Sequence, residues 1–303
     1  MSVTDQLLRI AVVGDGLVAD QYRDAIAHRI PGTLLVDADG APADATCVVA
    51  PTAERAALVG AAIAAGVPVC CPVPIASDLS TLDSLILRAA DAGTLVYVPN
   101  PLRHWLPLAT LHERRKSVGM PISLFAAHRT TRARAGDLFT DLALPLIDLA
   151  LWLVEAEVER VQVMAERLFT AGATGGAEGA DTALIIMRFA NGVIATLEVA
   201  RSLPDASSQP ETVSVEYLGG DAVLRAEPTN QAISVTGAGG TTRADWLPSP
   251  AVRIMETFVE TIRTGAVAPQ SLLDARWTLP VLEKVRLAAA TGEMVRVGGA
   301  LRR

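Results

Sequence analysis

The sequence predicts an α/β protein that combines a doubly wound parallel sheet with an α+β domain whose sheet is open and mostly antiparallel. Three observations predict this fold class. The chain has 303 residues, about twice the usual length of one domain. Short apolar strands alternate with helical segments in its first third. Longer strands with hairpin signals follow from about residue 120. We therefore expect one domain over residues 1–119 and a second over residues 120–303.

The first domain is predicted from a repeated strand and helix pattern. Its helices are expected at 17–30, 51–66 and 78–93, and the last two begin with helix-start residues and end in Gly. Five short apolar runs are the expected strands, at 8–14, 33–37, 45–50, 67–71 and 94–98. This βαβ pattern indicates that ligands bind at the carboxyl ends of the strands.

One connection in this pattern is unusually short. A helix and a further strand would ordinarily lie between 33–37 and 45–50, but the linking segment cannot hold a crossover helix. Either the second βαβ unit has been shortened, or the strand at 33–37 is not the usual second strand. In both cases the adenosine half of a cofactor site is in question.

The second domain is predicted from longer strands. A helix is expected over 137–154, two more near 250–264 and 271–290, and Asn191-Gly192 is a hairpin signal. The expected strands lie at 158–168, 181–190, 192–202, 211–219 and 293–297. These elements predict a largely antiparallel sheet with helices on one face.

Composition excludes several classes of function. The balance of 26 basic and 33 acidic residues gives a net charge of −7, which offers no electrostatic surface for nucleic acid. No basic leader precedes a long apolar stretch, and no window resembles a membrane span. Cys47, Cys70 and Cys71 have neither a disulfide pattern nor a metal-ligand spacing, and the adjacent pair is expected in a buried strand. We expect a cytoplasmic protein with a small-molecule substrate and no metal, nucleic-acid or membrane partner.

A glycine-rich turn follows the first predicted strand. In "GDGLVA", Gly14, Gly16 and Ala19 stand between a strand and a helix. In a Rossmann-like domain the first glycine makes the tight turn, and the second lets a pyrophosphate approach the helix N-terminus. The acidic residue that binds the ribose belongs about 20 residues further on, where Asp37 and Asp39 are candidates. We expect a dinucleotide site here; a turn that binds nothing and solvated aspartates remain the alternatives.

Seven segments occur in a recognisable order along nearly the whole chain. They are "RIAVVGDGLVAD", "ADATCVVAP", "AAGVPVCCPVPIA", "NPLRHWLP", "GDLFTDLALPLIDLALWLV", "FANGVIATLEV" and "ATGEMVRV". This order resembles the glucose-fructose oxidoreductase and inositol dehydrogenase family (Gfo/Idh/MocA). The resemblance implies NAD or NADP as cofactor and oxidation or reduction of a sugar-like or polyol substrate. It also implies a homo-oligomer, a dimer or a tetramer, that forms through the C-terminal sheet.

The chain departs from the family at the strand of "VCCPVPIA". In the family this strand typically ends in Glu-Lys-Pro, and the lysine lies beside the nicotinamide and the substrate hydroxyl. Pro72, Val73 and Pro74 stand at the matching positions. Removal of a hydride from a carbinol leaves a proton on oxygen, and a positioned acid or base is worth about 10² to 10⁴ in rate. Valine cannot supply that transfer.

A second departure lies in the family pattern Asp-x-Gly-x-His-x-x-Asp, whose histidine commonly acts as acid or base. Asp141 and Asp148 match, whereas Ala143 replaces the glycine and Pro145 the histidine. On a helix, Asp141, Pro145, Asp148 and Trp152 would share one face. Proline in a helix costs about 3 kcal/mol unless the helix starts or kinks there. The loss of both titratable groups argues that the family's usual dehydrogenation is absent.

Other polar residues are candidates for the same cleft. We name Asp148 and His104 as candidate catalytic residues, since a carboxyl among apolar neighbours can act as a base. The candidate lining of the substrate cleft is Arg103, Asp141, Val73 and Pro145. Simpler interpretations stay open, with His104 as a surface or capping residue and Asp148 as a buried structural carboxylate.

The segment "AAHRTTRAR" holds a further polar cluster of His128, Arg129, Arg132 and Arg134. Clustered arginines can hold a carboxylate or a phosphate. The simpler interpretation is a solvated loop over 129–134.

Three hypotheses about function follow. The chain is an NAD(P)-dependent oxidoreductase homologue whose sugar or polyol dehydrogenase mechanism is impaired or altered. Alternatively, it is a catalytically inactive homologue that serves as a binding or partner subunit. A non-redox enzyme that uses the same cleft is the third hypothesis.

Overall fold

The chain folds into two compact units. The computed structural model describes residues 7–38, 42–133, 136–169, 179–230, 232–237, 240–245 and 249–298. One unit comprises Met1–His104 with Pro248–Arg276, and the other comprises Trp105–Leu247 with Trp277–Arg303. The domain boundary predicted from the sequence lay after residue 119, with all later residues in the second domain. In the structure the first unit ends earlier and includes a segment from near the end of the chain.

The first unit contains the predicted parallel sheet. Its strands are β1 (Leu8–Val13), β2 (Thr33–Val36), β3 (Ala45–Val48), β4 (Val69–Cys70) and β5 (Val96–Tyr97). They pair in parallel in the order β2-β1-β3-β4-β5. The cysteines of β3 and β4 are fully buried, as expected for small apolar residues of central strands. Burial raises the pKa of Cys71, which directly follows β4, to about 12.

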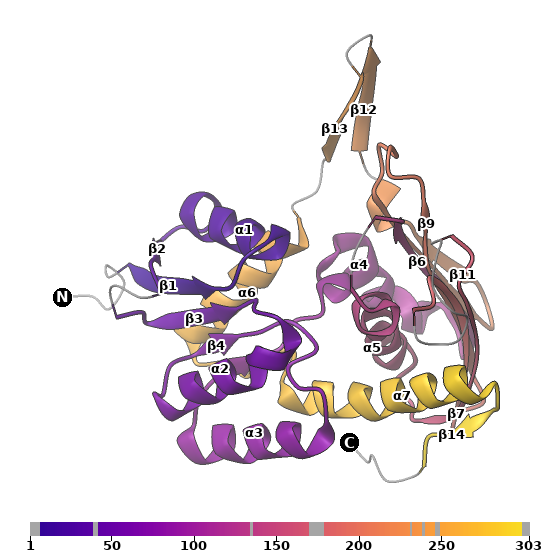
Figure 1. The fold of residues 1–303 in the computed structure, drawn as a ribbon, viewed down its shortest axis with the longest axis horizontal. Coiled ribbons are helices and arrows are strands. Elements are labelled where there is room, and N and C mark those ends of the chain that lie inside the picture. The colour runs from indigo at the N-terminus through magenta and orange to yellow at the C-terminus, as the bar shows by residue number, and fades with distance from the viewer. Residues whose placement is uncertain are drawn as a thin grey trace. The chain divides into compact units, whose positions relative to one another are not determined.

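Helices cover both faces of this sheet. They are α1 (Leu17–Asp24), which continues as a π-helical turn (Ala25–Arg29), α2 (Thr52–Ala64), α3 (Leu79–Ala92) and α6 (Pro250–Thr264). Figure 1 shows α1 on one side of the sheet and α2 with α3 on the other. Helix α3 begins where the Asp78 carboxylate accepts a bond from Thr81 N (2.8 Å) and ends at Gly93 in the left-handed conformation.

Helix α6 belongs to the first unit because its apolar face completes that unit's core. Ile254, Met255 and Phe258 are fully buried in one cluster with side chains of β1, α1 and β5. The Phe258 ring stacks on Tyr97 with centroids 6.1 Å apart. A doubly wound sheet must be covered on both faces. A late helix supplies part of that cover, which a domain boundary drawn from sequence order cannot anticipate.

The shortened second βαβ unit is confirmed. Strand β2 pairs with one edge of β1, and β3 pairs with the other. Only residues 37–44 link them, too few for a helix and an extra strand. At the end of this link, directly before β3, Asp44 forms a bidentate ion pair with Arg9 of β1, and the nearest contact is 2.7 Å. The strand at 33–37 is therefore the neighbour of β1 that a Rossmann-like sheet requires.

The second unit is built on a seven-stranded mixed sheet. Its order is β11-β10-β6-β9-β8-β7-β14, and among the described strand pairs only β6 with β9 is parallel. The strands are β6 (Pro121–Thr131), β7 (Val158–Glu166), β8 (Thr182–Phe189), β9 (Ile194–Leu203), β10 (Glu211–Gly219), β11 (Val223–Ala226) and β14 (Val295–Arg296). The prediction of a largely antiparallel sheet is confirmed. Strands β6 and β11 were not predicted from the sequence. The separate hairpin of β12 (Ala232–Gly237) and β13 (Gly240–Asp245) was not predicted either.

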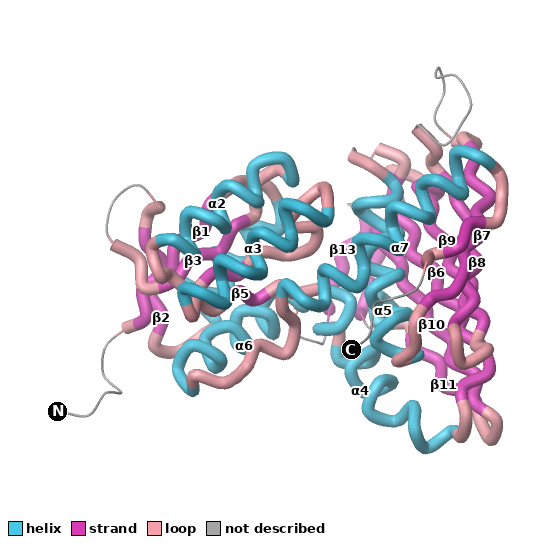
Figure 2. Tube along the Cα trace, turned by 90° about the horizontal axis from the view of Figure 1, so that it is seen from below, coloured by secondary structure: helices cyan, strands magenta, loops and turns pink. Residues whose placement is uncertain are grey.

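Helices lie on one face of this sheet, as predicted. Figures 1 and 2 show α4 (Leu106–Arg114), α5 (Leu144–Val154) and α7 (Leu272–Thr291) on the same side of the strands. Alternate strand residues such as Ile185, Met187 and Leu197 are fully buried against this side. The opposite face exposes large apolar side chains instead, among them Phe125, Met164 and Ile194. In the described part of the chain no helix is long and apolar enough to cross a membrane.

Candidate functional site

The glycine turn lies where the sequence places it, between β1 and α1. Gly14 has φ +109°, and a Cβ there would lie 2.7 Å from the carbonyl carbon of Val49. Gly16 precedes the first helical residue with φ 93° and ψ −179°, a region that essentially only glycine occupies. A Cβ on Gly16 would meet nothing within 4 Å, so this backbone borders open space. Ala19 is fully buried. The first glycine permits close packing, and the second leaves room for a ligand.

This turn lies at the switch point of the sheet. The chain leaves β1 toward β2 on one side, and β3 lies on the other side, so the segments after β1 and β3 diverge. Ligands of open α/β sheets bind at this point. The near approach of Gly14 to Val49 and Ala50 brings together the segments that follow β1 and β3. The arrangement fits the pyrophosphate of a dinucleotide at the N-terminus of α1.

The ribose candidate Asp37 is exposed and directly follows β2. Because β2 neighbours β1, Asp37 stands at the strand end where a ribose-binding carboxylate is expected. Asp39 lies outside the described residues. The assignment of Asp37 stays a prediction.

The segment after β4 has no titratable side chain at the family's lysine position. Val73 is half-buried, and the Val73–Pro74 peptide bond is cis. Arg55 from the first turn of α2 holds this segment. Its guanidinium donates to the carbonyl oxygens of Ala50 (2.7 Å), Pro72 (3.1 Å) and Pro74 (2.9 Å). A cation thus orders the backbone at the ends of β3 and β4, a role that no sequence motif indicated.

His104 is buried, which makes its interpretation as a surface residue wrong. Its Nε2 lies 2.8 Å from Tyr97 Oη and 3.0 Å from Gln270 Oε1. Burial lowers the pKa of His104 to about 4, although the Gln270 bond acts in the opposite direction. The imidazole is therefore neutral at pH 7. Nearby, Arg103 Nη1 lies 3.7 Å from Asp274 Oδ1, so this guanidinium already faces a carboxylate.

The Asp141 to Trp152 segment is helical, as predicted, but its first part is a π-helical turn (Phe139–Ala143). Helix α5 begins at Leu144, which places Pro145 in the first turn of the α-helix. Ala143 is itself helical, so Pro145 lies inside a continuous helical segment, at the change from the π turn to the α-helix. Proline removes one backbone donor there, and an irregular turn rather than a helix start accompanies it. Single π turns are frequent at functional sites.

Asp141 and Asp148 differ in their surroundings. Asp141 is half-buried, and its Oδ2 lies 3.4 Å from Arg201 Nη2. Asp148 is only 2% exposed and accepts a bond from Thr278 Oγ1 at 3.3 Å. Arg201 was not predicted, since its pairing with Asp141 spans 60 positions. Trp152 stacks on His112, with ring centroids 3.7 Å apart.

The cluster of "AAHRTTRAR" lies mainly in a strand. His128, Arg129 and Thr130 belong to β6, so the solvated-loop interpretation is wrong for the first part of 129–134. Arg129 forms a bidentate pair with Glu198 at 2.6 Å, and His128 Nε2 lies 2.5 Å from Glu211 Oε1. Arg132 lies 4.9 Å above the Phe169 ring. Arg134 falls outside the described residues. Most of these cations already have partners within the second unit.

Groups of three or more His, Cys, Asp or Glu side chains that could hold a metal ion do not occur among the residues that the structure describes. Asp37, Val73 and His104 lie in the first unit, and Asp141, Pro145 and Asp148 lie in the second. The predicted site residues are therefore divided between the two units.

Comparisons with known proteins agree with this geometry. A family model described as the GFO/IDH/MocA C-terminal domain matches residues 112–241. Inositol 2-dehydrogenase 1 of Saccharopolyspora erythraea is 27% identical over 193 residues, which cover 61% of this chain and 56% of the relative. Inositol 2-dehydrogenase of Acidothermus cellulolyticus is 28% identical over 193 residues, covering 61% of this chain and 55% of the relative. The match thus spans little more than half the length of these relatives.

Solved structures share the fold over nearly the whole chain. GenD2 from gentamicin A biosynthesis, in complex with NAD, superposes with a TM-score of 0.83 at 20% identity and 98% coverage of both chains. Myo-inositol 2-dehydrogenase from Lactobacillus plantarum gives a TM-score of 0.82 at 16% identity, covering 97% of this chain and 100% of the other. At such low identity these likenesses establish the fold.

Proposed function

Because this chain belongs to the Gfo/Idh/MocA family, we propose that it binds NAD or NADP at the Gly14 to Gly16 turn, while the family's usual proton transfer is impaired or altered. The chain is a homologue of the family's oxidoreductases. The observation that carries the cofactor proposal is the open backbone at Gly16, at the switch point of the sheet. When bound, the nicotinamide would supply hydride chemistry.

Different residues of the chain would bind different parts of the cofactor. Backbone N–H groups at the start of α1 would face the pyrophosphate, and Asp37 would accept bonds from the ribose hydroxyls. Arg55 would keep the segments after β3 and β4 in place beside them. These roles use backbone groups and one carboxylate, and none of them depends on the two substituted positions.

Proton transfer is where the proposal departs from the family. Val73 and Pro145 have no titratable group, and His104 is a neutral side chain held by Tyr97 and Gln270. Asp148 and His104 remain the candidate catalytic residues, and Arg103 and Asp141 the candidate cleft residues. The proposed substrate class is a sugar-like molecule or polyol, since the matched relatives are named inositol 2-dehydrogenases.

A titration with NADH and NADPH tests cofactor binding. We would follow nicotinamide fluorescence and calorimetric heat in the parent and in Gly16→Asp, which places a carboxylate where the pyrophosphate would lie. Gly16→Ala is the matched control, because it carries the same backbone strain without the charge. We expect micromolar binding in the parent, weaker binding in Gly16→Ala and none in Gly16→Asp. Absence of binding at millimolar cofactor in the parent would contradict the proposal.

The second candidate function is an inactive homologue that binds a small molecule or a partner subunit. The lack of a titratable side chain at both Val73 and Pro145 favours it. This alternative predicts that the parent shows no turnover with any polyol or sugar, whether or not NAD(P) binds. A non-redox reaction in the same cleft stays the third hypothesis.

We also propose a homo-oligomer, a dimer or a tetramer, that forms through the open face of the C-terminal sheet in the cytoplasm. Phe125, Met164 and Ile194 are 51%, 57% and 49% exposed on this unit. Exposed apolar patches on a sheet commonly mark association surfaces. Light scattering on the parent and on Phe125→Asp with Ile194→Asp tests this: we expect the double variant to be monomeric. A monomeric parent would contradict it.

A further inference from the structure

Three arginines lie at neighbouring positions on adjacent strands at one edge of the second unit's sheet. Arg160 of β7 lies directly opposite Arg188 of β8 and also directly opposite Arg296 of β14. In antiparallel pairs, directly opposite residues project on the same face, and their Cβ atoms lie about 5 Å apart. Arg160, Arg188 and Arg296 therefore form a continuous arginine row across three neighbouring strands.

The arginine row lies on the sheet face that points away from the core. Val161 and Met187, the strand neighbours of Arg160 and Arg188, are buried on the opposite face. Arg188 and Arg296 are exposed, and Arg160 is half-buried. A register shift between Val158 and Arg160 marks a bulge at Glu159. Bulges re-aim side chains at sheet edges, and this one places Glu159 beside the row.

The positive charge of the row is only partly compensated. Arg188 Nε lies 3.6 Å from Glu159 Oε2. Among the described residues, the hydrogen-bond partner of Arg160 Nη1 is the weakly accepting Met294 sulfur, at 3.7 Å. Within the described ranges, neither Arg160 nor Arg296 has a carboxylate oxygen within ion-pair distance. Like charges directly opposite each other on a sheet are destabilising. Arg160 and Arg296 therefore stand at directly opposite positions without a carboxylate partner among the described residues, although the net charge of the chain is −7.

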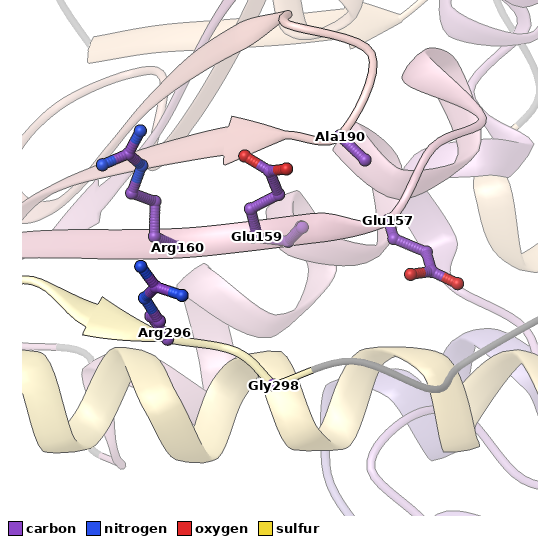
Figure 3. Close-up of a pocket in the computed structure, with 7 residues that line it drawn as sticks. Glu157, Glu159, Arg160, Ala190, Arg296 and Gly298 are labelled. Carbon is purple, nitrogen blue, oxygen red and sulfur yellow. The ribbon is translucent and has the colours of Figure 1, made fainter.

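A cavity of about 430 Å³ adjoins Arg160 and Arg296. Its lining comprises Glu157, Val158, Glu159, Arg160, Ala190, Arg296 and Gly298. Figure 3 shows the guanidinium groups of Arg160 and Arg296 extending to the same side, while Glu157 turns away from them. Cavities of this size hold small metabolites. The charged lining sets this cavity apart from an apolar ligand pocket.

We propose that the arginine row and its cavity bind a small multivalent oxyanion, of the phosphate monoester or dicarboxylate class. Guanidinium groups bind such oxygens through paired, charge-assisted N–H bonds. Two negative charges would offset the repulsion between Arg160 and Arg296. The carboxylate of Glu159 would stay with Arg188 and limit the site to ligands that reach the other two arginines. The site is built from residues of the second unit and is independent of the cofactor proposal. It lies on the same sheet face as the proposed association surface, because Arg188 is directly opposite Ile194.

Calorimetric titration of the whole chain with sodium phosphate and, separately, with sodium malonate tests the proposal. Sodium chloride keeps the ionic strength constant. We expect saturable binding of one anion per chain, and the tighter of the two ligands identifies the class. Charge-assisted bonds are strong enough that Arg160→Gln or Arg296→Gln should each weaken binding by at least about tenfold. Arg160→Lys should be intermediate, because an ammonium group cannot bind in bidentate fashion.

Arg225→Gln is the matched control, because Arg225 is an exposed arginine of the same sheet that is paired with Glu216. It should leave anion binding unchanged. Without anion, the urea midpoint of Arg296→Gln should equal or exceed that of the parent, since a repulsive charge is removed; this shows that the variant is folded. Unchanged affinity in both arginine variants, an equal heat with chloride, or no saturable heat in the parent would each overturn the proposal. A change of oligomeric mass in Arg160→Gln without any phosphate binding would assign the row to a protein contact instead.

Discussion

The glycine turn of the first unit and the proline-bearing helix of the second unit occupy family positions of different kinds. At Gly14 and Gly16 the important feature is an absent side chain, which lets backbone segments approach each other and leaves space before α1. Pro145 stands at the position that the resemblance matches to a histidine, and proline has no titratable side chain. A backbone site thus persists as long as the fold does, whereas a side-chain site can be lost while its helix stays intact. The following predictions test this contrast.

The largest effect is expected from restoring both missing groups, with Val73→Lys and Pro145→His in one chain. A positioned acid or base contributes about 10² to 10⁴ in rate. We expect NAD(P)H formation with polyols or sugars to rise by at least about 10² over the parent, and each single variant to gain much less. A folded, cofactor-binding double variant that stays inactive would contradict our account of what this chain has lost.

Gly14→Ala should disrupt the first unit. A left-handed-region φ of +109° strains any Cβ, and this one would lie 2.7 Å from Val49. Backbone strain and overpacking together should lower the free energy of unfolding by about 4 kcal/mol, measured by urea denaturation. Gly16→Ala meets open space and should cost only about 2 kcal/mol of strain. Equal losses in the two variants would show that the turn is not packed as described.

His104 should make the first unit sensitive to acid. Its pKa is lowered to about 4 in the folded chain, so the unfolded chain takes up the proton first as pH falls. Stability is therefore fully present above pH ~6.5 and is lost as pH falls toward 4, by up to about 3 kcal/mol. Urea denaturation across this range measures the loss. His104→Gln should remove most of this slope, and an unchanged slope would assign it to other groups.

Arg55→Gln gives the smallest effect of this series. The substitution removes bonds from a guanidinium to three carbonyl oxygens at the ends of β3 and β4. We expect a loss of about 2 kcal/mol in the free energy of unfolding. If the Arg55 hydrogen bonds also order the cofactor site, NADH affinity should fall together with stability. Arg88→Gln, which removes a single bond to Gly60 O, serves as the control. Unchanged stability would mean that the segments after β3 and β4 keep their conformation without Arg55.

The strands of the first unit could be predicted because each is a short apolar run between turn residues. Strand β6 escaped prediction because its last residues, including His128, Arg129 and Thr130, are polar. The partners of Arg129 and His128 are Glu198 and Glu211, which are 69 and 83 positions away. Local patterns cannot reveal such partners.

For the candidate site, too, features set by local sequence could be predicted, and features that depend on distant residues could not. The turn of Gly14, Gly16 and Ala19 follows from local sequence, and the structure places it at the switch point. The burial of His104 could not be predicted, since its contact with Gln270 joins residues 166 positions apart. The accommodation of Pro145 depends on a π-helical turn just before it. A periodicity of 3.6 residues cannot reveal that turn.

The late position of helix α6 in the sequence has a consequence for folding during synthesis on the ribosome. The last strand of the first unit's sheet is Val96–Tyr97, whereas α6 begins only at Pro250. Roughly half of the chain is made between them, which takes about 10–30 s at ordinary rates of synthesis. Throughout that interval the nascent sheet lacks the cover of Ile254, Met255 and Phe258. The emerging sheet therefore keeps apolar surface exposed until α6 is made, and a chain that ends before Pro250 lacks part of the first unit's core.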